Sequence, residues 1–189
     1  SFVLDATPPA NPAVTVTDVT CNSATLSWTG YTAPADLTGF QIYVSTEGPF
    51  SEVDGTSFSY LINPGLRTFE VGALALDTPY HLAVVAMDAL GNYTGSVTSH
   101  EVLIPEVIPP LPSITVSPGA DPDSAVISWV GYDSSLCGFS GFKVYREESD
   151  FTTLTGLTEV ASLGAGEREV SFTGLDRTRT YYMAVVGVN

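Results

Sequence analysis

The chain has 189 residues, a length that suits one large domain or two small ones. Hydrophobic residues make up 44% and charged residues only 14%, while 17 Gly and 13 Pro mark many turns, which favours a β-rich globular protein. Six Lys and Arg against 21 Asp and Glu give a net charge of −15, so nucleic-acid partners and anionic membranes are excluded. No apolar run approaches the roughly 18 residues of a membrane-spanning helix, and no membrane insertion is expected.

An internal repeat of about 100 residues covers nearly the whole chain. The segment SATLSWTGY at Ser23–Tyr31 recurs as SAVISWVGY at Ser124–Tyr132, and YHLAVVAMD at Tyr80–Asp88 recurs as YYMAVVGVN at Tyr181–Asn189. Four prolines in Ile104–Ser113 favour an extended, stiff connection between the copies. We therefore predict an N-terminal strand-like segment and linker at 1–12, a first domain at 13–104, a linker at 105–112 and a second domain at 113–189.

Short segments with alternating apolar and polar residues predict that each copy is an antiparallel β-sandwich with almost no helix. In chain order, we expect strands in the first copy near Val14–Val19, Ala24–Trp28, Phe40–Ser45, Thr68–Ala73, Tyr80–Met87 and Gly95–Leu103, with a short connecting strand within Pro49–Gly65. The second copy repeats this order up to the counterpart of Tyr80–Met87. It is therefore predicted to lack its own strand G, the last strand of such a sandwich.

Two short patterns that occur in both copies are typical of one domain family. A tryptophan ends the second expected strand, as Trp28 and Trp129, and an aromatic-x-apolar pattern begins the third, at Phe40–Ile42 and Phe142–Val144. Each copy therefore resembles a fibronectin type III domain. The resemblance implies an all-β fold of two tandem immunoglobulin-like sandwiches, in which both tryptophans anchor the cores.

The family's Leu-x-Pro-x-Thr-x-Tyr corner is partly present in each copy. Leu74–Tyr80 keeps the Leu, Thr and Tyr but has Leu76 where Pro is usual, and Leu175–Tyr181 keeps only the Leu and Tyr. The resemblance implies that Tyr80 and Tyr181 are further core anchors. Asp88–Asn92 is similar to a turn common in bacterial extracellular members. Such domains serve as spacers, adhesive modules and filament parts, so the resemblance does not select one function.

Residues that could support catalysis are scarce. The chain has two histidines, His81 and His100, and neither lies beside a Ser or Cys motif. The alternation of Tyr80–Met87 predicts that His81 faces solvent, and the lone lysine, Lys143, is also expected to point outward. We expect no enzyme activity and no cofactor.

Acidic turns and one sequon are candidate ligand or modification sites. Asp121, Asp123 and Asp176 are expected at one end of the second sandwich and could surround a calcium ion, but their spacing matches no EF-hand loop. Solvated acidic turns are the favoured interpretation, and we predict no metal. Asn92 begins an Asn-Tyr-Thr sequon on an exposed turn and is a glycosylation candidate.

The outward face of the strand at Tyr80–Met87 is apolar, and so is that of its counterpart in the second copy. This predicts a covered sheet, shielded either by neighbouring side chains or by a partner subunit. Tyr43 and Tyr145 are expected beside these faces, where either ring could stack on a sugar, but the charged residues Arg146, Glu147 and Glu148 beside Tyr145 make a poor platform.

The two cysteines, Cys21 and Cys137, do not occupy equivalent positions in the repeat, so they are not a repeated core disulfide. Cys21 is expected at the end of the first domain where the chain leaves, and Cys137 at the end of the second where it enters. We predict an inter-domain disulfide between them. The alternative is two free thiols, as expected in a reducing compartment.

The first residues resemble a segment at the end of the first copy: Ser1–Leu4 aligns with Glu101–Ile104. We hypothesise that this segment of one subunit adds to the final strand of another and builds a head-to-tail filament. The alternative is that both ends belong to a longer tandem array. The donor strand would be Ser1, Phe2, Val3, Leu4 and Asp5, and the acceptor Tyr181, Tyr182, Met183, Ala184, Val185, Val186, Gly187 and Val188.

The leading functional hypothesis is a non-enzymatic structural protein, located outside the cell or on its surface, that forms a filament or appendage. The alternative is a spacer, adhesive or ligand-binding fragment of a larger surface protein or of a secreted carbohydrate-active enzyme. The expected partners are copies of the chain itself or neighbouring repeats, with other surface proteins and glycans as further candidates.

Overall fold

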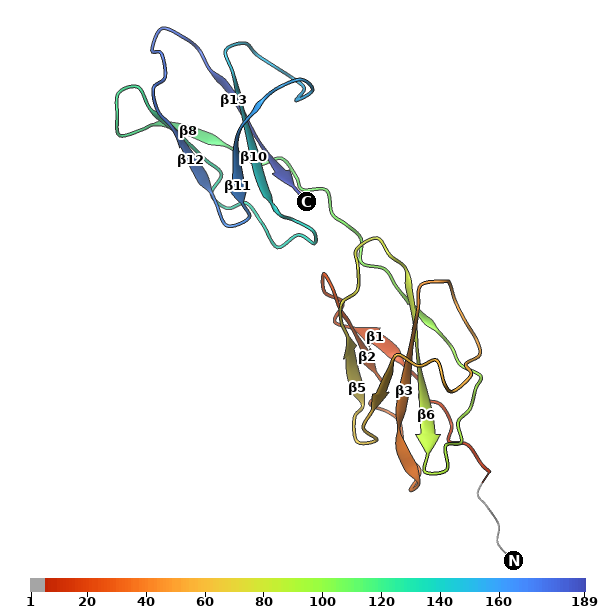
Figure 1. The fold of residues 1–189 in the computed structure, drawn as a ribbon. Coiled ribbons are helices and arrows are strands. Elements are labelled where there is room, and N and C mark those ends of the chain that lie inside the picture. Colours follow the sequence, from red (N-terminus) through yellow and green to blue (C-terminus); the bar gives the residue numbers. More distant parts are fainter. Residues whose placement is uncertain (1–5) are drawn as a thin grey trace, which may run out of the picture. The chain divides into compact units, whose positions relative to one another are not determined.

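The computed structural model describes residues 6–189 and divides the chain after Pro105 into two units (Figure 1). In the described residues each unit consists of strands and loops without helix, which confirms the all-β prediction. Each unit is a sandwich of two antiparallel sheets.

The described residues of the first unit form seven strands. One sheet has the order β1-β2-β5 and the other the order β4-β3-β6-β7. The strands are β1 (Thr15–Thr17), β2 (Ala24–Ser27), β3 (Leu37–Ser45), β4 (Tyr60–Ile62), β5 (Thr68–Val71), β6 (Tyr80–Asp88) and β7 (His100–Val102).

The core of the first unit forms where the alternating residues of facing strands meet. Leu26 on β2 and Ile42 on β3 are fully buried. Trp28, which follows β2, is 1% exposed, and its ring lies 5.2 Å from that of Phe40. Burial of such large apolar side chains supplies the main stabilisation of a sandwich.

The second unit repeats this arrangement with six described strands. Its sheets have the orders β8-β9-β12 and β11-β10-β13. The strands are β8 (Thr115–Pro118), β9 (Ala125–Ser128), β10 (Gly141–Glu147), β11 (Glu159–Gly164), β12 (Glu169–Phe172) and β13 (Tyr182–Val188). Its buried core consists of Ile127, Trp129, Phe142, Val144 and Val185.

The last strand of the first unit is much shorter than the expected strand at Gly95–Leu103. Strand β7 pairs with β6 only over His100–Val102. The chain before it bonds to the loop after β3 instead, because the Val97 N–H donates to the Ser51 carbonyl and the Val53 N–H donates to the Gly95 carbonyl, each at 2.9 Å. These bonds hold the segment away from β6.

Tyr80 and Tyr181, the two tyrosines expected as core anchors, are half-buried and do not belong to the fully buried core side chains. Each instead fixes the turn before its strand through its hydroxyl oxygen. The Tyr80 hydroxyl accepts the Ala75 N–H and the Tyr181 hydroxyl accepts the Asp176 N–H, both at 3.1 Å.

An arginine occupies an equivalent place in both units. The Arg67 guanidinium donates to the carbonyls of Pro64 and Leu66 and lies 5.6 Å from the centre of the Phe40 ring. Arg168 repeats this geometry 101 residues later, beside Phe142. In each unit one cation therefore closes the turn that leads into β5 or β12.

Candidate functional site

A loop crosses the outer face of the β3 and β6 sheet in the first unit. We call this loop, residues 49–59, the strap. Phe50, Val53 and Phe58 of the strap pack against a buried cluster of Tyr43, Ala83 and Val85, joined by Tyr93 and Val97 from the segment after β6. The apolar outer face of β6 is therefore covered by the unit's own chain.

Hydrogen bonds from the sheet and from the segment after β6 hold the strap in place. The Tyr43 hydroxyl donates to Gln41 Oε1 at 2.9 Å, and Gln41 Nε2 donates to the Gly55 carbonyl at 3.1 Å. The Tyr93 hydroxyl donates to the Asp54 carbonyl at 2.7 Å. Because Gln41 is only 2% exposed, its amide depends on these partners in place of water.

The Asp54 side chain organises the turn at the tip of the strap. Its Oδ1 accepts the N–H groups of Thr56 and Ser57 at 2.9 and 2.8 Å, and its Oδ2 accepts the Ser57 hydroxyl at 2.8 Å. These hydrogen bonds, led by the one from the Ser57 N–H, hold the pKa of Asp54 well below its usual range. Asp54 therefore stays ionised at any ordinary pH.

The neighbouring tyrosine is affected in the opposite sense. Burial, together with the charge of Asp54, raises the pKa of Tyr43 to about 12. Its hydroxyl consequently remains a hydrogen-bond donor through the physiological range.

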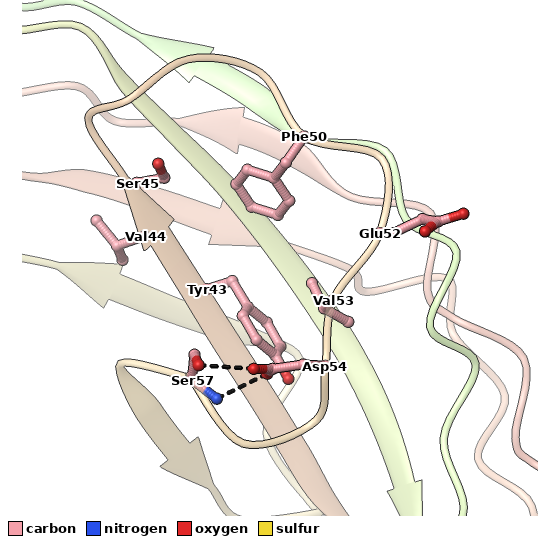
Figure 2. A pocket seen from close by; sticks show the side chains of 8 residues that line it. All are labelled: Tyr43, Val44, Ser45, Phe50, Glu52, Val53, Asp54 and Ser57. Atoms are coloured by element: carbon pink, nitrogen blue, oxygen red, sulfur yellow. Dashed lines mark hydrogen bonds between the residues drawn. The ribbon is translucent and has the colours of Figure 1, made fainter.

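A cavity of about 340 Å³ lies between the strap and β3. Figure 2 shows the Phe50 ring over the sheet and Asp54 beside Tyr43 and Ser57. The cavity has an apolar floor and carboxylate and hydroxyl groups at its edge. Its lining residues are Tyr43, Val44, Ser45, Phe50, Glu52, Val53, Asp54 and Ser57.

Two expectations about the outer face are wrong. His81 is 7% exposed and Tyr43 is 5% exposed, so His81 does not face solvent and the Tyr43 ring cannot stack on a sugar. Tyr145, the counterpart of Tyr43, is half-buried. The alternating pattern placed these side chains on the outer face, but it carried no information about the loop that covers that face.

The sequence does contain a signal for the strap. Phe50, Val53 and Gly55 recur 101 residues later as Phe151, Leu154 and Gly156, and both glycines have positive φ, 74° and 85°. A repeated Phe-x-x-apolar-x-Gly pattern within an otherwise polar connection indicates a loop that packs against the sheet.

The proposed acceptor strand corresponds to β13, which in the described residues pairs with β10 along one edge. A groove of about 350 Å³ beside it is lined by Leu111, Pro112, Ile114, Phe151, Thr152, Thr153, Leu154, Met183, Ala184, Val185 and Val186. The proposed donor, Ser1 to Asp5, lies outside the described residues.

The three candidate calcium ligands are not brought together. No group of three or more His, Cys, Asp or Glu side chains within residues 6–189 is arranged to hold a metal ion. The Asp176 carboxylate instead accepts the N–H and hydroxyl of Thr178 and pairs with Arg179, whose other partner is Glu148.

The sequon side chain has a structural role in the turn after β6. Asn92 Nδ2 donates to Asp88 Oδ2 at 2.8 Å, and the Asn92 and Leu90 N–H groups donate to Asp88 Oδ1. Burial alone would raise the pKa of Asp88, but these hydrogen bonds lower it overall. The amide nitrogen that would carry a glycan is thus engaged in the folded domain.

Cys21 and Cys137 are both disulfide-bonded in the structure, so the free-thiol alternative does not hold there. The protein has no other cysteine.

The family model of the fibronectin type III domain matches residues 7–101, half of the chain. The chain belongs to the fibronectin type III family. The resemblance recognised in the tryptophan and aromatic-x-apolar patterns is thereby confirmed.

Two curated relatives are similar to both fibronectin type III copies together. Chitinase A1 of Niallia circulans is 28% identical over 179 residues, which is 90% of this chain and 24% of the chitinase. Exoglucanase B of Cellulomonas fimi is 28% identical over 165 residues, which is 84% of this chain and 14% of that enzyme. The chain thus spans less than a quarter of the length of either relative.

Among solved structures, the central fibronectin-III array of RIM-binding protein matches 96% of this chain and 64% of its own, with 14% identity and a TM-score of 0.39. The chicken CNTN1 FN1–FN3 domains match 96% of this chain and 60% of their own, with 13% identity and a TM-score of 0.39. Across residues 6–189, no helix has the length and apolar character needed to cross a membrane.

Proposed function

We propose that this chain is a non-catalytic, extracellular spacer module of a larger carbohydrate-active enzyme. The observation that carries the proposal is the relation to two enzymes named for polysaccharide chemistry, each of which is matched over 24% of its length or less. The match covers both copies of this chain but only a small part of each enzyme. An accessory region shared by these enzymes would produce such a match.

The side chains of the two sandwiches support a spacer over a sugar-binding module. Carbohydrate recognition favours an exposed aromatic surface, but Trp28 and Trp129 are in the cores and Tyr43 lies under the strap. The disulfide-bonded cysteines fit an oxidising compartment. The proline-rich segment between the copies favours a stiff connection, which suits a part that sets the separation of other domains.

The purified chain tests this proposal in one sedimentation and hydrolysis assay with insoluble chitin and insoluble cellulose. We expect the chain to stay in the supernatant with both polymers and to release no reducing sugar. Release of sugar would overturn the non-catalytic assignment. Saturable depletion of the chain from the supernatant would replace the spacer by a polysaccharide-binding module.

A second candidate is self-assembly by strand donation. It is favoured because β13 pairs with only one strand, β10, among residues 6–189. Ser1 to Asp5 of one copy would add to the free edge of β13 in another. Deletion of these five residues should then abolish oligomers while the first unit stays folded. Oligomers that survive the deletion, or a chain that is monomeric at every concentration, would refute strand donation.

A further inference from the structure

The cavity under the strap combines an apolar lining with two carboxylates, Glu52 and Asp54, of which Asp54 is held in place by hydrogen bonds within the strap. Tyr43, Phe50 and Val53 supply the floor, and Asp54 lies beside Tyr43 at the edge (Figure 2). A volume of about 340 Å³ is at the lower end of the range of ligand pockets, which runs from about 300 to 1,000 Å³. Such a space suits a single side chain better than an extended ligand.

The Asp54 carboxylate can accept a further donor. A carboxylate offers about four acceptor positions, and hydrogen bonds within the strap use three of them, two on Oδ1 and one on Oδ2. The Thr56 hydroxyl also contributes to the lowered pKa of Asp54, so a further donor shares the remaining position on the carboxylate with it. Because both oxygens are already held by the strap, the carboxylate needs no reorganisation to receive a ligand.

No cation of the first unit neutralises Asp54 in the described structure. All ion pairs found there lie in the second unit. Arg67 is the single Lys or Arg of the first 105 residues, and its guanidinium is occupied by the carbonyls of Tyr31, Pro64 and Leu66. Asp54 is therefore an exposed carboxylate without an ion-pair partner among the described residues, and a cation of another molecule would complement its charge.

Elsewhere in this chain, the cations that contact aromatic rings are arginines. Guanidinium groups of Arg67, Arg146 and Arg168 each lie 5.3 to 5.7 Å from the centre of an aromatic ring. A planar guanidinium can stack on a ring and donate to a carboxylate at the same time, which an ammonium group does less well. We propose that the cavity under the strap is a docking site for an arginine side chain of a partner protein, stacked on Phe50 and hydrogen-bonded to Asp54.

The test is an amide chemical-shift titration of the full chain with a capped Gly-Arg-Gly peptide. Capped Gly-Lys-Gly and Gly-citrulline-Gly are the controls, because citrulline keeps the shape of arginine without its charge. We expect saturable shifts at Ser45, Val53 and Ser57 with arginine, weaker binding with lysine and none with citrulline. Raising the salt concentration should weaken the binding, as screening requires.

Two variants locate the site. Asp54→Asn keeps an acceptor for the Thr56 and Ser57 N–H groups and should weaken arginine binding by at least about tenfold. Asp18→Asn removes the same charge from an exposed position and should leave binding unchanged. Phe50→Leu keeps an apolar floor without a ring and should abolish the preference for arginine over lysine.

Equal shifts with citrulline, or undiminished binding in both Asp54→Asn and Phe50→Leu, would overturn the proposal. The absence of any saturable shift would overturn it as well. If Asp54→Asn displaces the strap, which the amide shifts of Val53 and Tyr93 report directly, the Phe50→Leu result decides alone.

Discussion

Gly55 of the strap lies directly against the ring of Tyr93, so close that a Cβ atom at position 55 would come within 2.3 Å of the ring. The same ring is held by the hydrogen bond from its hydroxyl to the Asp54 carbonyl. The strap can therefore lie on the sheet only if residue 55 has no side chain.

Replacement of Gly55 by alanine should destabilise the first unit strongly. The matched control is Gly156→Ala in the second unit, where φ is also positive but no atom lies within 4 Å of the new Cβ. The control should cost about 1–2 kcal/mol for the left-handed backbone. Gly55→Ala should cost about 1–3 kcal/mol more, for the clash. Urea unfolding monitored separately for each unit measures both values, and equal losses would contradict the packing of the strap on Tyr93.

Acid should remove the contribution of Asp54 to stability. Its pKa in the folded protein lies below the ordinary value of 3.8, so its stabilising effect is complete above pH 3.8 and disappears as the pH falls through the lower, folded value. The difference in melting temperature between the parent chain and Asp54→Asn should therefore shrink between about pH 5 and pH 2. A difference that stays constant or grows over that range would show that the hydrogen bonds to Asp54 do not depend on its charge.

Arg67→Lys should destabilise the first unit although it keeps the charge. Lysine cannot donate from a planar fork to the carbonyls of Tyr31, Pro64 and Leu66 while it stacks on Phe40. We expect a loss of about 1–3 kcal/mol in the free energy of unfolding of that unit. Arg177→Lys, on an exposed turn of the second unit, is the control and should change little. Equal effects of the two changes would mean that Arg67 acts only through its charge.

The pairing of the two disulfide-bonded cysteines can be tested directly. Both cysteines are disulfide-bonded, and we predict that the bond joins Cys21 to Cys137 within one chain. Proteolysis under non-reducing conditions followed by mass spectrometry should yield one linked peptide pair from a monomer. Reduction should lower the melting temperature, because closing a loop of about 100 residues is worth up to about 4.7 kcal/mol. Two alkylatable thiols in unreduced, denatured protein would refute the bond.

Much of the framework could be predicted from the sequence because the alternation of buried and exposed residues is a local signal. The patterns around Trp28 and Phe40 placed β2 and β3, and the repeat offsets of 101 and 102 residues placed β9 and β10 in the second unit. The offset also contained the strap, in the repeated Phe50 and Gly55, but that pattern lies in a connection where period-2 alternation carries no information.

The parts that escaped prediction depend on contacts between segments far apart in the chain. The buried Tyr43 packs against Tyr93 and Val97 from the segment after β6, and the Tyr80 hydroxyl accepts the N–H of Ala75. Likewise, β7 is short because Gly95 and Val97 bond to the strap. No pattern in those strands alone could show these partners.

The size of the native polypeptide tests the spacer assignment most directly. An antibody against this chain, used on the secreted fraction of the organism that makes it, should detect a polypeptide several times larger than 19.9 kDa that co-purifies with activity on chitin or cellulose. A native polypeptide of about 19.9 kDa, alone or as a ladder of its multiples, would contradict the spacer and favour self-assembly of the chain.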